Sequence, residues 1–320
     1  SWHDRFTPEL VKFLRECVIH GIEHISEEPS RILGDRLASF RDVMIQDSTI
    51  IRLHKSLADK WPATRSRKVA AGVKVAFLTS AIANSPKSIS ILPENTNDVK
   101  TLKIGPWVKD IILLIDLGFY KYQLFSRIVE NGGSFVSRLK SNANPLIVGT
   151  NQVRNTRGVD LNGKHLKDIK LEKSDDIFDV NVEVSFDRRS YRGESKKDNK
   201  IFRLVAIYNT EAEEHHFYLT NISSDILNAS EVAAVYSGRW EVELIFKELK
   251  SRYALDQITT KSPYAIEALI WVSILTLLVS RKLYSIVRKL NPGAKMVRFT
   301  QLRWSSIFVQ NSSHLLSAIL

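Results

Sequence analysis

Cysteine and methionine are scarce in this chain of 320 residues, which has one cysteine, Cys17, and two methionines. A single cysteine forms no disulfide within the chain and cannot supply the ligands of a zinc cluster. Disulfide scaffolds and cysteine-ligated metal sites are therefore excluded, and the composition suits a reducing compartment. Any metal ion would be held by oxygen or imidazole ligands.

Long apolar runs are also missing. The longest largely apolar run, from Ala268 to Val279, is about half to two-thirds of the roughly 20 residues that a membrane-spanning helix needs. We therefore predict a buried core helix there, and no membrane partner. The first residues lack the basic segment followed by an apolar one that a secretory signal shows. Because the chain begins with Ser1, we expect it to belong to a longer product with a further N-terminal module.

Acidic residues are outnumbered by basic ones. The 46 lysines and arginines against 35 aspartates and glutamates give a formal net charge of +11 at pH 7. A field of this sign attracts polyanions such as nucleic acid or an anionic membrane face. The apolar share of 44% and charged share of 25% are typical of a soluble globular chain, so extended disorder is not expected.

The apolar patterning predicts an α/β fold with one β-rich insertion. Strand-like runs cover residues 40–53, 72–82, 87–92, 111–116 and 134–140, with a helix over 122–129 before the last of them. The polar, strand-like stretch 141–224 predicts the insertion, and helical periodicity covers 7–24, 230–253 and 263–290. Within the insertion, the segment from Arg188 to Arg203 holds seven basic residues.

Two carboxylates follow buried strand-like runs. Asp47 comes after VMIQ, and Asp116 comes after IILLI. A carboxylate at the end of a covered strand is costly unless it is paired or bound to a metal, so two such groups indicate a shared cation. Asp42 and Asp110 are the alternatives. We favour Asp47 and Asp116 because Asp42 precedes its apolar run and Asp110 lies near the start of its strand.

The segment 236–250, YSGRWEVELIFKELK, combines cationic, phenolic and carboxylate groups. On one ideal helix at about 100° per residue, four of them fall within roughly 60° of one another: Tyr236, Arg239, Glu243 and Lys250. Such a face suits phosphates held beside a divalent cation. Alternatively, Glu243 pairs with Lys247 on the surface, an arrangement worth about 0.2–0.5 kcal/mol, and the two cations are simply solvated.

This spacing, Tyr-x2-Arg-x3-Glu-x6-Lys, resembles the YREK signature of the DDE transposases of bacterial and archaeal insertion sequences, the group that includes the hairpin-forming cut-and-paste enzymes. Other segments stand in family-like order: Asp-Ser-Thr at Asp47, Asp-x-Gly-Phe-Tyr at Asp116, Phe-Val-Ser-Arg at Phe135 and Tyr-Leu-Thr-Asn at Tyr218. The resemblance covers roughly residues 31–283.

The resemblance implies an RNase H-like mixed sheet flanked by helices, with the β-rich insertion before the last catalytic helix. It implies that Asp47, Asp116 and Glu243 are catalytic and bind two Mg²⁺ ions, with Mn²⁺ as the alternative. It further implies phosphate contacts from Tyr236, Arg239 and Lys250. We expect Arg138 and Tyr120 to line the active-site groove.

Several other residues are interpreted from charge and position. The basic stretch predicts contacts with the DNA backbone, with a loop that has no partner as the alternative; its candidates are Arg188, Arg189, Lys196 and Lys197. Trp240 is interpreted as an aromatic residue of the core or its rim, with stacking on an unpaired DNA base near the cut as the alternative. The adjacent His215 and His216 are interpreted as ordinary strand positions.

The implied function is that of a DNA transposase, which cleaves transposon ends in a metal-dependent reaction and transfers the strand into target DNA. The expected partners are double-stranded DNA and a second copy that bridges two ends, in a prokaryotic cytoplasm at the nucleoid. The alternatives are a catalytically silent DNA-binding protein derived from a transposase, and a nuclease of the same fold without strand transfer. The predicted segments are an N-terminal helical part (1–30), a first core part (31–140), the insertion (141–225), a second core part with the catalytic helix (226–290) and a C-terminal segment (291–320).

Overall fold

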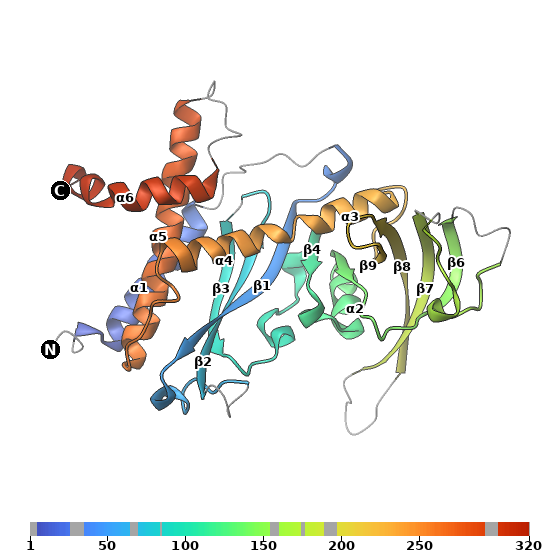
Figure 1. Cartoon of the computed structure of the whole chain (residues 1–320), viewed down its shortest axis with the longest axis horizontal. Coiled ribbons are helices and arrows are strands. Elements are labelled where there is room, and N and C mark those ends of the chain that lie inside the picture. The colour runs from blue at the N-terminus through green and yellow to red at the C-terminus, as the bar shows by residue number, and fades with distance from the viewer. Residues whose placement is uncertain are drawn as a thin grey trace. The chain divides into compact units, whose positions relative to one another are not determined.

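The computed structural model of the chain (Figure 1) describes residues 5–25, 35–64, 70–83, 85–153, 160–173, 177–188, 197–291 and 300–319. The chain divides into two compact units, and each is discontinuous in sequence. Unit 1 consists of Ser1–Ile32, Asp47–Asn97 and Trp240–Leu320, and unit 2 consists of Leu33–Gln46 and Asp98–Arg239.

Unit 2 is built on a sheet with the strand order β1-β4-β5-β9-β8-β7-β6. Strand β1 (Asp42–Leu53) gives its first five residues to this unit, where they run parallel to β4 (Ile111–Ile115). Strand β4 in turn runs parallel to β5 (Ser134–Arg138). Parallel strands that are covered on both faces read as continuous apolar runs, and all five residues of β4 are buried.

The helix between β4 and β5 is α2 (Tyr122–Glu130), which connects them as a crossover. Its Phe125 stacks on Phe135 of β5, with the ring centroids 4.3 Å apart. Both rings are fully buried. This contact fixes α2 against the sheet and so fixes the short segment that leads from Asp116 into the helix.

The β-rich insertion continues the same sheet. Its strands are β6 (Leu146–Val153), β7 (Ile177–Asp187), β8 (Lys197–Asn209) and β9 (Glu214–Thr220). They pair antiparallel, and β9 also pairs antiparallel with β5. The alternation of Phe178, Val180 and Val182 inward along β7 is that of a strand with one buried face. The expected insertion of strands before the last core helices is confirmed.

The single helix predicted over 230–253 is wrong, because the structure has two helices there. Helix α3 (Ala229–Ser237) ends at Gly238, and α4 (Trp240–Arg252) begins two residues later. Glycine is a poor helix former, and a Cβ at Gly238 would lie 3.1 Å from the carbonyl oxygen of Val235. The boundary between the units falls between Arg239 and Trp240. The shared stripe of Tyr236, Arg239, Glu243 and Lys250 has members in both units and stays a prediction.

Unit 1 combines the strand order β3-β2-β1 with helices. Strands β2 (Ala71–Ser80) and β3 (Ser85–Pro93) pair antiparallel. The helices are α1 (Pro8–Ile25), α4, α5 (Pro263–Leu290) and α6 (Gln301–Ile319). Helix α1 packs along α5 (Figure 1). Phe246 of α4 contacts Phe77 of β2, with the ring centroids 5.3 Å apart, so α4 lies against the sheet.

Helix α5 is the one helix among the described residues that is long and apolar enough to cross a membrane by length and composition. It contains the apolar run from Ala268 to Val279, and more than half of its most apolar window is buried within the protein. Ser262 caps its first turn by accepting a hydrogen bond from the main-chain N–H of Ala265.

Taken by class, the fold is a mixed sheet flanked by helices, as predicted for an RNase H-like protein. The parallel pairing of β1, β4 and β5 and the antiparallel hairpin of β2 and β3 carry that agreement. The division into five segments made from the sequence stays a prediction.

Candidate active site

Asp116 lies at the carboxyl end of β4 in unit 2, directly before the short helix η6 (Leu117–Phe119). It is the N-cap of η6, and its Oδ2 accepts a hydrogen bond from the N–H of Gly118 at 3.4 Å. Its side chain is 41% exposed although the strand before it is buried. Ligands of open α/β sheets bind outside the carboxyl ends of the strands, which is the position of this carboxylate.

A second carboxylate flanks the same turn. Asp98 begins the short helix η4 (Asp98–Thr101). A Cβ on Gly118 would lie 3.0 Å from Asp98 Oδ2 and 3.8 Å from Asp116 Oδ2, so the missing side chain of Gly118 leaves room between the two carboxylates. Nothing in the sequence pattern marked Asp98, because it follows a polar stretch instead of an apolar strand.

Arg239 and Tyr236 lie on the same side of unit 2 as Asp116. The Nε atom of Arg239 is 3.9 Å from Asp116 Oδ1. The ring of Tyr236 packs against Tyr218 of β9, with the centroids 5.3 Å apart. Burial raises the pKa of Tyr236 to about 12, and the neighbouring Arg239 acts in the opposite direction. The phenol is therefore protonated at neutral pH and can donate a hydrogen bond.

Arg138, the last residue of β5, completes this cluster. Its guanidinium Cζ lies 5.5 Å from the centroid of the Tyr218 ring. Burial raises the pKa of Tyr218, and it lowers the pKa of His216, with the charge of Arg138 as the next cause for His216. His216, interpreted from the sequence as an ordinary strand position, thus feels the charge of Arg138. Unit 2 therefore brings together four residues singled out from the sequence: Asp116, Arg138, Tyr236 and Arg239.

A cavity of about 740 Å³ opens in unit 2 beside the segment that follows Asp116. Tyr120 and Tyr122 line it, and the two hydroxyl groups are hydrogen-bonded at 3.1 Å. Lys140 also lines it, with its Nζ 5.4 Å from the centroid of the Tyr120 ring. Tyr120 is buried and forms part of the wall of this cavity.

The helix that carries Tyr236 begins with a capping box. The side chain of Asn228 accepts a hydrogen bond from the N–H of Glu231, and the Glu231 carboxylate accepts one from the N–H of Asn228. Arg36 donates to the same carboxylate at 3.0 Å. These contacts satisfy main-chain donors that would otherwise have no partner within the first turn.

Replacing Asn228 by alanine is expected to lower the free energy of unfolding by about 1 kcal/mol, since the side-chain cap is lost. Urea unfolding followed by circular dichroism measures it. Replacing Asn228 by aspartate keeps an oxygen at the cap and serves as the control. Equal stability of the alanine and aspartate variants would show that the cap does not stabilise α3.

Asp47, Glu243 and Lys250 belong to unit 1. Asp47 is half-buried, and its Oδ1 accepts a hydrogen bond from the N–H of Ser48 at 2.7 Å. It does not end its strand as the sequence suggested, because β1 continues to Leu53. Glu243 and Lys250 are half-buried on α4, whose apolar stripe is buried in the core of the unit.

The rival carboxylates occupy different settings. Asp42 starts β1 and is buried, and its Oδ1 accepts a hydrogen bond from the N–H of Val43 at 2.8 Å. Asp110 is exposed before β4 and has a φ of 59°, in the left-handed region that aspartate and asparagine tolerate. Asp42 is thus the first residue of its strand and Asp110 directly precedes its strand, so neither follows a buried run.

The predicted triad is thus divided between the units, with Asp47 and Glu243 in unit 1 and Asp116 in unit 2. Among the residues that the structure describes, no three histidine, cysteine, aspartate or glutamate side chains gather in an arrangement that could hold a metal ion. The chemistry of the three carboxylates nevertheless fits a hard divalent cation, which prefers carboxylate oxygen.

The basic stretch of the insertion is only partly described. Arg188 is exposed and forms ion pairs with Asp198 and Glu130, at 2.7 and 2.8 Å. Lys197 is exposed at the start of β8. Arg189 and Lys196 lie outside the described residues. Arg188 is therefore held by two carboxylates of its own unit.

Comparison with known proteins decides the family. The sequence profile of the Transposase DDE domain matches residues 38–279, about three-quarters of the chain. The chain belongs to the DDE transposase domain family. The match contains Asp47, Asp116 and Glu243 together with the whole β-rich insertion.

Curated relatives of this DDE domain agree with the match. The chain is 25% identical over 280 residues to the transposase for insertion sequence element IS1151 from Clostridium perfringens, covering 79% of this chain and 59% of that protein. It is 20% identical over 305 residues to the transposase for IS231F from Bacillus thuringiensis subsp. israelensis, covering 82% and 61%. A 73-residue stretch, 23% of this chain, is 38% identical to the putative transposase InsL for IS186A from Escherichia coli, of which it covers 20%. The chain spans about three-fifths of the length of the first two relatives.

Proposed function

We propose that this chain is the catalytic part of a DNA transposase that cleaves the ends of an insertion element and joins the cut end to target DNA. The match of residues 38–279 to the Transposase DDE domain carries the proposal. The relatives named as transposases of insertion sequences support it. The net charge of +11 suits a polyanionic partner.

The proposed catalytic residues are Asp47, Asp116 and Glu243, and their carboxylates are the proposed ligands of two Mg²⁺ ions, which Mn²⁺ can replace. Divalent ions bound there would lower the pKa of an attacking water or 3′ hydroxyl and neutralise the charge on the leaving oxygen. Asp116 suits this role because its partly exposed carboxylate stands at a strand end. Glu243 on α4 is fixed by the buried apolar residues on either side of it in the sequence, Val242 and Ile245.

Positive and phenolic groups beside Asp116 are proposed to hold the DNA phosphates. Arg138 and Arg239 offer guanidinium groups, which bind phosphate oxygens with two parallel hydrogen bonds. Tyr236 stays protonated and donates one hydrogen bond. Lys250 on α4 and the basic stretch with Arg188 and Lys197 are proposed as further contacts with the backbone, which carry affinity without sequence preference.

Replacing Tyr236 by phenylalanine is expected to lower the cleavage rate by about 10- to 100-fold, because a hydrogen bond to a charged group contributes about 1.5–3 kcal/mol. The ratio of the cleavage rate of the unaltered protein to that of the phenylalanine variant should be the same at about pH 7 and about pH 9.5. Burial raises the pKa of Tyr236 to about 12, so the phenol keeps its proton across this pH range and loses the proton only at higher pH. Single-turnover cleavage across the range measures the ratio. A ratio that approaches one toward about pH 9.5 would mean that the phenol titrates there.

The proposed function is tested with the DNA that flanks the gene at both ends of its element. A labelled duplex of that DNA should be nicked at the element's end when Mg²⁺ or Mn²⁺ is present, and not after chelation. The control duplex has the same composition in scrambled order. No cleavage of either duplex at any ion concentration would contradict the proposal and leave a DNA-binding protein.

Strand transfer separates a transposase from a nuclease of the same fold. A pre-cleaved element end supplied with a circular target DNA should yield products in which the end is joined to the target. Where two copies of the chain bridge two ends, both ends should be joined to the same target. Cleavage without joining would assign the chain to the nucleases. The proposed place of action is the prokaryotic nucleoid, where both DNA substrates lie.

A further inference from the structure

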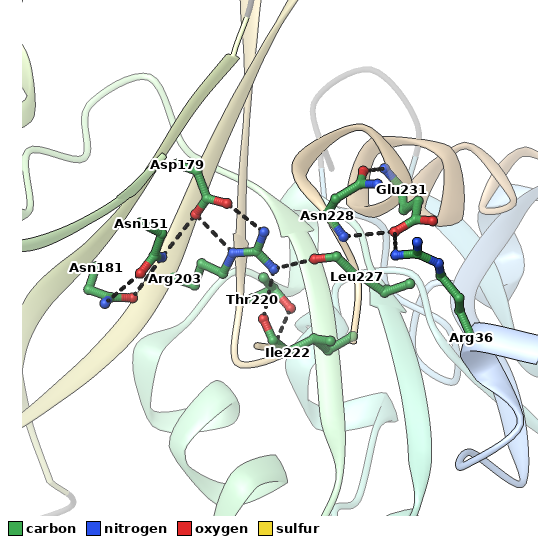
Figure 2. A network of polar contacts seen from close by, with 10 residues as sticks. All are labelled: Arg36, Asn151, Asp179, Asn181, Arg203, Thr220, Ile222, Leu227, Asn228 and Glu231. Atoms are coloured by element: carbon green, nitrogen blue, oxygen red, sulfur yellow. Dashed lines mark hydrogen bonds and ion pairs between the residues drawn. The ribbon is translucent and has the colours of Figure 1, made fainter. Parts of the chain in front are cut away.

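A buried ion pair joins two strands of the β-rich insertion in unit 2. Arg203 on β8 and Asp179 on β7 are almost fully buried, with side-chain exposures of 4% and 2%. The guanidinium forms two parallel hydrogen bonds to the carboxylate, from Nε to Oδ1 at 2.9 Å and from Nη2 to Oδ2 at 2.6 Å (Figure 2). This is the bidentate geometry of strong charged pairs.

The carboxylate of this pair is itself held in place. Asn151 of β6 donates from Nδ2 to Asp179 Oδ1 at 3.0 Å, and it exchanges hydrogen bonds with Asn181 (Figure 2). Strands β6, β7 and β8 therefore all contribute to fixing the orientation of the guanidinium. A side chain fixed in this way can position whatever its remaining donor contacts.

That donor, Nη1 of Arg203, binds the segment that leads into α3. It donates to the carbonyl oxygen of Ile222 at 3.1 Å and to that of Leu227 at 2.7 Å. Both residues are buried, so their carbonyls need partners within the protein. Leu227 directly precedes Asn228, the N-cap of α3, and Figure 2 shows the contacts running from Asp179 through Arg203 to this point.

Helix α3 connects this anchor to the candidate active site. It carries Tyr236 near its end, and Arg239 follows two residues after the helix and lies 3.9 Å from Asp116. The pair of Arg36 and Glu231 also holds the first turn, so the start of α3 is fixed from two directions. Because α3 is a rigid element, a shift at its start moves the groups at its end.

We propose that Arg203 is a positioning residue for the DNA chemistry, which sets the place of Tyr236 and Arg239 by holding the Ile222 and Leu227 carbonyls at the start of α3. This inference rests on the proposed function. The β-rich insertion would then position α3 for catalysis: Asp179 orients Arg203, and Arg203 orients the helix.

The test replaces the pair by apolar residues, in the double variant Asp179→Leu/Arg203→Met, because such replacements of buried ion pairs are often neutral or stabilising. Hydrogen exchange should become faster at the N–H groups of Glu231 and Val232 in α3. In cleavage of the element-end duplex, the rate at saturating DNA should fall by about 10- to 100-fold, because Tyr236 and Arg239, which are proposed to hold the phosphates beside Asp116, would be displaced by about 1 Å. The DNA concentration for half-saturation should change little, since the further proposed backbone contacts, Lys250 and the basic stretch with Arg188 and Lys197, do not depend on α3.

Two further variants keep the result interpretable. Arg203→Lys keeps the positive charge but loses the planar guanidinium with its two parallel hydrogen bonds. It should show the faster exchange in α3 and the lower cleavage rate to a smaller extent, even if the double variant fails to fold. Arg41→Met is the matched control, because Arg41 also holds main-chain carbonyls of unit 2, those of Trp107 and Lys109, at 3.1 and 2.7 Å. It should leave exchange in α3 and the cleavage rate unchanged.

Two outcomes overturn the inference. If exchange in α3 rises but the saturated cleavage rate does not fall, Arg203 has a structural role only. If exchange in α3 is unchanged in the folded variants, the network does not hold the helix. Failure of the proposed function is distinguishable from both: the unaltered chain would cleave no DNA, whereas the exchange measurement would still report whether Arg203 fixes α3.

Discussion

Asp116→Asn is expected to lower the rate of DNA cleavage by at least about 100-fold, since a metal-held charge in phosphoryl transfer contributes several kcal/mol. Asparagine has the same shape and is an equally good N-cap, so it keeps the hydrogen bond from Gly118 that starts η6. The fold and the contacts around β4 should therefore persist. Single-turnover nicking of the element-end duplex measures the rate, and a band-shift assay shows that DNA binding remains.

The matched control is Asp110→Asn, which alters the rival carboxylate six residues earlier. Asp110 is exposed and has a positive φ of 59°, which asparagine also tolerates. The change should leave the cleavage rate within about twofold of that of the unaltered protein, because Asp110 is not a proposed ligand and a surface substitution changes the free energy of unfolding by less than about 0.5 kcal/mol. A loss of cleavage in the Asp110 variant, with normal cleavage in the Asp116 variant, would exchange the roles of the two residues.

The same logic separates the other proposed ligands from their neighbours. Glu243→Gln should abolish cleavage, whereas Glu241→Gln, two residues earlier on α4, should not. Asp47→Asn should abolish it, whereas Asp42→Asn should not. Each pair differs in position only, so the set tests the assignment of the three carboxylates independently of net charge.

The sequence sufficed for features that depend on local periodicity. An apolar run of five residues predicted the buried strand β4 and the place of the carboxylate directly after it, because a strand covered on both faces has no polar positions until it leaves the sheet. The insertion was predicted for the same reason, from alternating residues such as those of β7. Both are properties that each segment shows by itself.

Features that depend on neighbours distant in sequence were not predictable in this way. The break between α3 and α4 at Gly238 interrupts a run whose helical periodicity is otherwise continuous, and it falls at the boundary between the two units. Asp98 lies in a polar stretch whose pattern does not single it out, although the turn at Gly118 lies beside both Asp98 and Asp116. Asp179 and Arg203 lie 24 residues apart on strands that read as half-exposed.

The charged residues of α4 and α5 show the same limit. Glu248 follows Lys247 in a segment that reads as a solvated helix face, yet its side chain is 1% exposed. Its partner is Arg281 of α5, whose guanidinium donates to Glu248 Oε2. Tyr253 adds a hydrogen bond to Oε1 at 3.1 Å, and burial raises the pKa of its phenol. Helices α4 and α5 are therefore joined by a buried polar contact within unit 1.

Arg281→Met is expected to lower the free energy of unfolding by about 3–5 kcal/mol, because it leaves the Glu248 carboxylate buried without its cation. The double variant Glu248→Leu/Arg281→Met should recover most of that loss, since no buried charge remains. Denaturant unfolding of the three proteins measures both effects. Lys289→Met, at an exposed position of the same helix, is the control and should change stability by less than about 0.5 kcal/mol.

The comparison of the single and double variants also bears on catalysis. Glu248 lies five residues after Glu243 on α4, so its partner Arg281 helps to hold the helix that carries the proposed ligand. If the double variant is as stable as the unaltered protein and cleaves DNA at the same rate, apolar packing alone positions α4. If it is stable but slow, the ion pair sets the position of Glu243, because stability and geometry are then separated in one protein.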